Sequence, residues 1–521
     1  MIKKRKKGWP LAVLMMVLLA LLPDSAGAFI YGDAGILNGS TRTFNLTAKD
    51  GYISLSDGTQ AYMWGYMSQS TNYVCPNATT GVATTCVNPF PNVIQYPGPT
   101  LIVNQGETVV VNLTNSIPTV PGNTAVNTSI VFPGQTVTTS GGVAGLLTQE
   151  AASGGGTVQY TFVATQPGTY TYYSGTETWL QVEMGLVGAI VVRPNNVGTA
   201  YCPAPPANPG APNNSYAYCI KNGYYDHEYL FLTSEMDTNI HSLIQFGQMP
   251  VVDNSIYHPN VWFFNGRNYP DSMSIDYASW LPSQPYSATP AMHPLESVLL
   301  RIIGGGRDLH PFHTHGQNHS VIARNGRLLQ SGVNAGFADM PISDYTTTTV
   351  PGETADAIWG PWTGKYLNWD IWGVPASHNT SCTTARIASG PLTPLITFLH
   401  NNQPALNIGL TEFDATTSEW CTDHNKKIPV LLPSPSRLSF GVMYGGTPYI
   451  GQPGELPPID PTTGENHSYQ NPLGGLSFMW HSHSERELTT NNVFIGGMAT
   501  EALVLPYHEV VNGVDDLIII P

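Results

Sequence analysis

The chain has 521 residues, of which 41% are hydrophobic and only 11% are charged, with 52 Gly and 43 Pro. This composition is too apolar for a disordered chain, and it holds too much Gly and Pro for a helical bundle or a coiled coil. The net charge of −15 argues against non-specific nucleic-acid binding. We therefore expect an all-β protein built from many short strands joined by turns.

The first predicted element is a secretory signal peptide over residues 1–28. Five basic residues precede an apolar run from Leu11 to Leu22, and Ala26-Gly27-Ala28 is typical of a cleavage site. An uncleaved anchor is the alternative, but the run is shorter than the roughly 20 residues that span a bilayer. We expect an exported protein with no transmembrane segment after cleavage, which lowers the net charge from −15 to −19 by removing five basic residues and one acidic residue.

Strand-like patterns then occur twice along the chain. Residues 109–113 alternate as strand residues do, and a similar phrase, 295–303, follows about 190 residues later. Each phrase has a further strand pattern downstream, at 168–192 and at 476–505. The chain is therefore predicted to repeat one β-sandwich unit.

The repeat suggests domain boundaries. We predict a first domain over 29–200, a Pro-rich linker over 201–223 and a second domain over 224–521. The second domain is expected to contain a large insertion over about 373–474, which lacks clear periodicity and is interpreted as loops and short strands.

The six cysteines fall into three pairs that are close in the sequence: Cys75/Cys86, Cys202/Cys219 and Cys382/Cys421. None lies in a CxxC motif or beside a histidine, so a thiolate metal site is not expected. In an exported chain this usage predicts structural disulfides. Pairing between neighbours is the favoured interpretation, although the sequence leaves the connectivity open.

The histidines carry the functional prediction. The first of the 15 is His227, so the first predicted domain contains none. Two clusters stand out, His310-Pro311-Phe312-His313-Thr314-His315 followed by His319, and His481-Ser482-His483. Residues i and i+2 of a strand share a face, so two His-x-His pairs can close on one metal, and imidazole suits copper, zinc, iron and nickel. The candidate ligands are His313, His315, His481 and His483, with His310 and His319 as further candidates. The alternative is a hydrogen-bonded histidine cluster left from a lost site.

These residues resemble motifs of the multicopper oxidases, a family of the cupredoxin superfamily. The segment 310–316 is similar to the family's HPxHxHG motif, and 480–483 with Met498 is similar to its closing HCH…GM motif. The phrases 96–106 and 184–192 resemble those of the family's first domain. The resemblance covers most of 90–195 and 224–372, then 474–506. It implies two cupredoxin-like Greek-key β-sandwich domains and a copper cofactor. The variant resembled most closely is a bacterial subgroup linked to manganese and iron oxidation.

Departures from the motifs imply a reduced copper site. Val131, Pro133, Tyr173 and Gly175 stand where the resemblance places first-domain histidines, so half of the trinuclear ligands are missing. At the mononuclear site His310 and Met498 match, but Ser482 replaces the cysteine thiolate, and the second histidine's place falls near Glu487. A serine hydroxyl cannot act as a soft anionic ligand. Laccase-like reduction of dioxygen by the family's electron path is therefore not expected.

Two functions follow. The first is a copper-binding protein with fewer than four coppers per chain, in which Glu485, Glu487 or a neighbouring subunit is a candidate to complete the metal site. It would oxidise metal ions or small reductants, and the sequence leaves its catalytic residues open. The second is a non-catalytic secreted scaffold for copper sequestration or cell-surface structure.

The 137 residues between Tyr173 and His310 are too few for another sandwich of about 100 residues with its connections. The resemblance to two-domain relatives therefore also suggests a homotrimer.

Overall fold

The computed structural model describes residues 30–76, 83–195, 215–220, 222–292, 296–332, 336–360 and 476–504. It also describes the short strands β27 (Phe413–Asp414), β28 (Glu419–Trp420), β29 (Thr447–Pro448), β34 (His508–Val511) and β35 (Val514–Leu517). The predicted signal peptide, most of the linker and most of the insertion lie outside the described residues. Within the described part of the chain, no helix has the length and apolar character needed to cross a membrane.

The N-terminal part forms two facing sheets, the first unit. One sheet has the order β13 (Gly168–Tyr173), β14 (Val187–Arg193), β7 (Gly98–Asn104), β1 (Gly32–Asp33), β5 (Tyr73–Pro76), β6 (Ala83–Cys86). The other has the order β2 (Ile36–Asn38), β3 (Thr41–Ser54), β8 (Thr108–Asn115), β12 (Thr157–Val163), β9 (Thr138–Gly141), with β4 (Gln60–Ser68) beside β3. The hairpin β10 (Val143–Ala144) and β11 (Gln149–Glu150) and the helix α2 (Thr178–Gln181) complete the unit. Phe44, Val111 and Ile190 from both sheets share one core.

The C-terminal part forms a second pair of sheets, the second unit. One has the order β23 (Arg327–Leu328), β22 (His319–Arg324), β26 (Thr354–Trp359), β20 (Val298–Gly304), β17 (His227–Met236), β18 (Val261–Phe264), β31 (Thr489–Thr490), β32 (Val493–Phe494), with β24 (Ile342–Asp344) beside β22. The other has the order β19 (Ala291–Met292), β33 (Ala499–Val504), β30 (Leu476–Ser482), β21 (His310–Thr314), β25 (Thr346–Thr349), with β29 beside β30. Phe231, Phe312 and Trp480 lie in the core between them.

The all-β prediction is confirmed. The regular alternation of residues 109–113 appears in β8, where buried and half-buried side chains follow one another along the strand. Among the described residues the longest helix is α3 (Thr238–Gln245), whose N-cap is Asp237. The Asp237 side chain accepts a hydrogen bond from the Asn239 N–H at 3.0 Å. The predicted domain boundaries stay a prediction.

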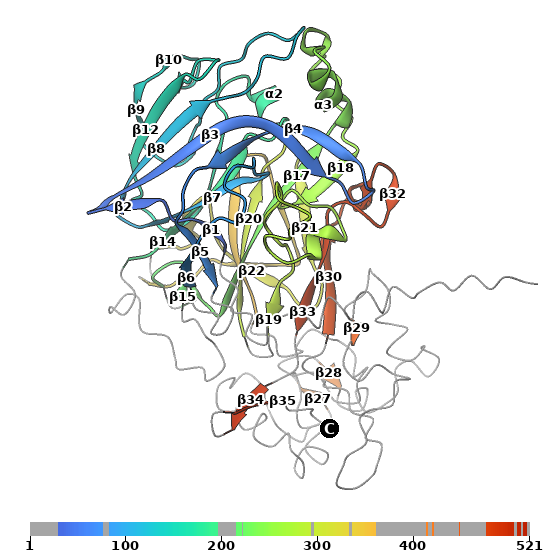
Figure 1. Ribbon diagram of the computed structural model, residues 1–521. Coiled ribbons are helices and arrows are strands. Elements are labelled where there is room, and N and C mark those ends of the chain that lie inside the picture. Colours follow the sequence, from blue (N-terminus) through green and yellow to red (C-terminus); the bar gives the residue numbers. More distant parts are fainter. Residues whose placement is uncertain are drawn as a thin grey trace, which may run out of the picture.

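The two units share an apolar junction. Ile102 and Val191 of the first unit lie in one buried cluster with Leu232 and Phe263 of the second. The helix α3 follows β17 but packs Ile240 and Ile244 into the core of the first unit, and Figure 1 places it against β4. The second unit therefore packs against the first through a sheet face and through the helix α3.

A buried network of charges lies at the same junction. Arg301 on β20 is fully buried, and its Nε lies 2.9 Å from Glu228 on β17. Glu228 also pairs with Arg193 of the first unit, while Arg301 Nη1 donates to Thr169 Oγ1 at 2.9 Å. Two arginines around one glutamate lower the pKa of Glu228 to about 2, although burial alone would raise it. This network joins strands of both units.

Candidate metal centre

The strands β21 and β30 are neighbours in one sheet, and their register brings the two histidine motifs together. His313 lies directly opposite His481, and Phe312 lies opposite Ser482. Along β21 the residues alternate between the buried inner face of the sheet and its half-buried outer face. His313 and His481 therefore share the outer face, while His310 lies on the inner face.

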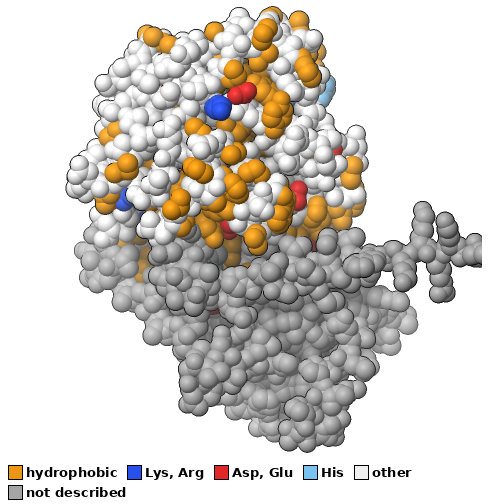
Figure 2. Space-filling view, viewed as in Figure 1, with side chains coloured by type: hydrophobic (Ala, Val, Ile, Leu, Met, Phe, Trp, Pro, Cys, Tyr) orange, Lys and Arg blue, Asp and Glu red, His pale blue; other side chains and the backbone are white. Residues whose placement is uncertain are grey.

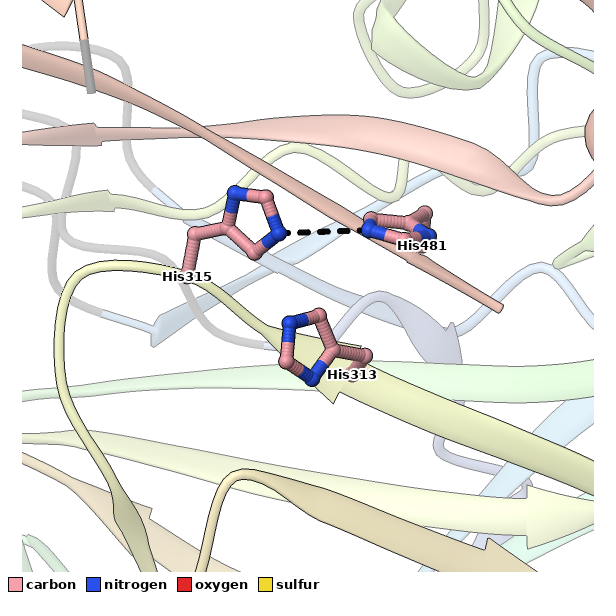
Figure 3. Close-up of side chains that lie close together, drawn as sticks. All are labelled: His313, His315 and His481. Atoms are coloured by element: carbon pink, nitrogen blue, oxygen red, sulfur yellow. Dashed lines mark hydrogen bonds between the residues drawn. The ribbon is translucent and has the colours of Figure 1, made fainter. Parts of the chain in front are cut away.

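Three imidazoles of the outer face converge. Ligand nitrogens of His313, His315 and His481 all lie within 4.8 Å of one another, and Nε2 of His315 is 3.2 Å from Nε2 of His481 (Figure 3). His483 stands beside them, with its ring centroid 4.7 Å from that of His313 and 5.8 Å from that of His481. We call these four residues the histidine cluster. Among the described residues, no other three His, Cys, Asp or Glu side chains bring their ligand atoms this close.

Hydrogen bonds fix how two of these rings face. His313 Nδ1 lies 2.8 Å from Thr346 Oγ1 on the neighbouring strand β25. His481 Nδ1 donates to the Ser482 carbonyl oxygen at 2.6 Å. Such bonds at one ring nitrogen are typical of metal-binding histidines, because they fix the tautomer and leave Nε2 for the metal.

A third contact holds the turn that carries His315. Trp480 is fully buried, and its indole N–H donates to the His315 carbonyl oxygen at 3.0 Å. Trp480, which directly precedes the motif His481-Ser482-His483, thus positions His315 at the end of the other motif. Neither Trp480 nor Thr346 was predicted as part of the site, because their partners depend on strand register.

Two histidines of the cluster, His313 and His481, favour the neutral imidazole. Burial and the neighbouring His315, His481 and His483 lower the pKa of His313 to about 3. Burial also lowers the pKa of His481 below its usual range. A neutral imidazole keeps a lone pair for a metal, so the electrostatics suit copper, zinc, iron or nickel.

His310, one of the further candidate ligands, does not join the cluster. Its side chain has no solvent exposure, and it lies between two carboxylates. Nε2 is 2.7 Å from Glu235 Oε2, and Nδ1 is 2.8 Å from Glu487 Oε2. Burial alone would lower the pKa of His310, but these two hydrogen bonds outweigh it and raise the pKa to about 9. The odd spacing from His313 to His310 already places them on opposite strand faces, and this signal was available in the sequence.

His319 does not join the cluster either. It begins the next strand, β22, where its Nδ1 lies 2.9 Å from Thr314 Oγ1 and its Nε2 lies 2.7 Å from Thr347 Oγ1. Both ring nitrogens are thus used by threonine hydroxyls in the interior. Burial lowers the pKa of His319 to about 4, so it is a neutral, hydrogen-bonded core histidine.

Of the two glutamates predicted to complete the site, one lies near the cluster and the other lies on the inner face. Glu485 is exposed and close enough to His481 to act on it electrostatically. Glu487 is buried and bonds to His310 on the inner face. Tyr345, which was not predicted, stands at the rim of the cluster with its ring centroid 5.7 Å from that of His313 and 57% of its surface exposed.

The structure also brings together first-unit positions where the resemblance placed histidines. Val131 and Tyr173 are bridge partners, with the Val131 N–H donating to the Tyr173 carbonyl oxygen at 2.8 Å. A Cβ on Gly175 would come within 2.7 Å of Val131 Cγ1. Apolar contacts thus occupy the place where these residues meet.

Comparison with known proteins finds similarity over part of the chain. Residues 87–197 match the family model of the multicopper oxidases. This segment is therefore similar to the multicopper oxidases. Copper is the cofactor of that family. The matched segment spans most of the first unit's strands from β7 onward, while the histidine cluster lies in the second unit.

Individual relatives match the chain over a short stretch. Multicopper oxidase MCE of Talaromyces pinophilus is 38% identical over 103 residues, which are 19% of this chain and 15% of that protein. Laccase abr2 of Aspergillus fumigatus is 33% identical over 103 residues, which are 19% of this chain and 16% of that protein. Among solved structures, the blue copper oxidase of Nitrosomonas europaea has a TM-score of 0.44 at 16% identity, covering 89% of this chain and 85% of that one.

Proposed function

We propose that this chain is an exported copper-dependent oxidoreductase with a reduced metal centre at the histidine cluster. The observation that carries the proposal is the convergence of ligand nitrogens from His313, His315 and His481 within 4.8 Å. Their donor set fits copper, because imidazole is a good ligand for it and both His313 and His481 have their other ring nitrogen hydrogen-bonded. Bound copper would supply one-electron redox chemistry.

The residues of this chain have separate roles in that proposal. His313, His315 and His481 hold the metal, and Thr346 and Trp480 position the ligands. His483 is exposed at the edge, where it is available as a further ligand. The absence of histidine before His227 supports fewer than four coppers per chain, because the first unit offers no imidazole to complete a larger cluster.

Metal ions and small reductants are the proposed substrates. The net charge of −15 favours the approach of cations, and the resemblance to the manganese- and iron-oxidising subgroup points to the same class of substrate.

The proposal of export is based on the N-terminal pattern, and the proposal of disulfides is based on the cysteine usage. The hairpin β5–β6 supports one pair, since it carries Cys75 and Cys86 on adjacent strands. A homotrimer remains a prediction that light scattering of the purified protein would test.

Ser482 stands where the resembled motif has a cysteine thiolate, and this favours a second candidate function, a copper-sequestering scaffold without catalysis. Oxidation of ferrous or manganous ions and of small phenols should be assayed in the copper-loaded wild type, His313→Gln and His258→Gln. His258 is an exposed histidine outside the cluster. Turnover lost only in His313→Gln supports the oxidoreductase. Copper retention without turnover in the wild type would leave the scaffold, and no copper retention would refute both.

A further inference from the structure

The inner face of β21 and β30 holds a second set of ionisable groups, distinct from the histidine cluster on the outer face. His310, Glu235 and Glu487 are all buried there, and each His310 ring nitrogen contacts a different carboxylate. This is where the family resemblance would place a mononuclear copper, so the fit of these residues to a metal can be judged directly.

The hydrogen bonds of His310 do not fit a metal ligand. A metal binds a lone pair on one ring nitrogen, whereas a carboxylate accepts a hydrogen bond from the N–H that faces it. At 2.7 Å and 2.8 Å, both His310 nitrogens are at donor distance from carboxylate oxygens, so neither presents a lone pair.

The carboxylates are themselves held in place. Oε1 of Glu235 accepts the Arg307 N–H at 2.6 Å and the Asp308 N–H at 3.0 Å, and it lies 3.0 Å from the Tyr257 hydroxyl. The Arg307 guanidinium stands over the Tyr257 ring at 4.0 Å. Glu235 is therefore fixed by two backbone donors and cannot turn away from His310 without leaving them unpaired.

The remaining residues of this position do not offer a metal an anionic ligand. Ser482 is fully buried, and its Oγ accepts the Ser484 N–H at 3.2 Å. Met498 is fully buried in the apolar core with Phe312 and Trp480. A hydroxyl and a thioether are weak ligands without a thiolate beside them.

We infer that Glu235, His310 and Glu487 form an ion triad that occupies the mononuclear position in place of a metal, and that substrates meet the protein at the histidine cluster itself. The second part rests on the proposed function. If the triad occupies the mononuclear position, the histidine cluster is the remaining candidate metal site among the described residues. The cluster has its own solvent-exposed rim at His483 and Tyr345. The substrates that we propose for this rim are hydrated metal ions and single-ring reductants.

The test compares the same substitution at two positions three residues apart on β21. Wild type, His310→Gln and His313→Gln are dialysed against copper alone, and bound copper is measured with circular dichroism as a check of folding. We expect His310→Gln to keep the wild-type copper content while its melting temperature falls, and His313→Gln to lose its copper. A folded His310→Gln variant that loses copper would overturn the triad.

Two further measurements remain decisive if His310→Gln does not fold. Nitrogen-15 NMR of the wild type should show both His310 ring nitrogens protonated at neutral pH, before and after Zn²⁺ is added. Loss of one of these protons on Zn²⁺ addition would overturn the triad. Ser482→Cys loaded with copper should develop no intense blue absorption, and a blue band there would also overturn it. If the wild type binds no copper, the proposed function fails while the NMR result still decides the triad.

Discussion

His313 and His481 are direct cross-strand partners on β21 and β30, with ring centroids 5.2 Å apart. This pairing brings two sequence motifs that are 168 residues apart onto one face of a sheet. Because each motif has the form His-x-His, the alternation of strand residues then places His315 and His483 beside the pair. The proposed centre thus follows from strand register.

Substitution of His313 by Gln should strongly weaken copper binding, because it removes one of the three imidazoles whose ligand nitrogens converge. We expect at least a roughly 100-fold loss of copper affinity, because losing only the hydrogen-bonding partner of a ligand typically costs about 10–100-fold. Competition with a chelator measures the affinity. His258→Gln should match the wild type, and equal affinities for all three proteins would rule out the cluster.

Substitution of Thr346 by Val should weaken copper binding without removing it. The hydroxyl holds His313 Nδ1 at 2.8 Å, and loss of such an outer contact typically costs about 10–100-fold in metal affinity. Thr348→Val makes the same change two residues further along β25, at an exposed side chain, and should leave the affinity unchanged. Identical effects of the two substitutions would show that Thr346 does not orient the ring.

The ion triad predicts how stability depends on pH. The folded pKa of His310 is raised to about 9 from an ordinary 6.5, so its stabilising contribution is complete below pH 6.5 and is lost as the pH rises through about 9. Burial opposes ionisation of Glu235, yet the hydrogen bond to His310 lowers its pKa, so its contribution is lost on the acid side. Urea unfolding between pH 6 and pH 10 should show a decline near pH 9 that Glu235→Gln reduces. A decline of the same size in Glu235→Gln would contradict this assignment.

Substitution of Arg301 by Leu should strongly destabilise the chain. It leaves Glu228 and Asp356 buried beside one fewer cation, and breaking a buried ion pair costs about 3–5 kcal/mol. Arg324→Leu removes a partly exposed arginine that pairs with Glu353 at 3.0 Å, and should cost about 1 kcal/mol or less. Chemical denaturation of both variants measures the difference, and equal losses would show that the junction network contributes little.

The sequence predicted those features that depend on local periodicity. Strand alternation was enough to anticipate the all-β fold and the shared face of His313 and His315. The same rule separates His310 from His313, although resemblance to a motif had grouped them. Glu235 could not be assigned to His310 from the sequence, because 75 residues and the pairing of β17 within another sheet intervene. Thr346 and Trp480 were missed for the same reason: their roles depend on which strands become neighbours.

The central claim is a copper site made by the histidine cluster, and metal analysis tests it most directly. Purified protein is loaded with copper, dialysed, and examined by elemental analysis and electron paramagnetic resonance. The account predicts about one copper per chain with a type 2 signal and no intense blue band, as expected for imidazole ligands without a thiolate. No retained copper, or an intense blue band with a full set of coppers, would contradict it.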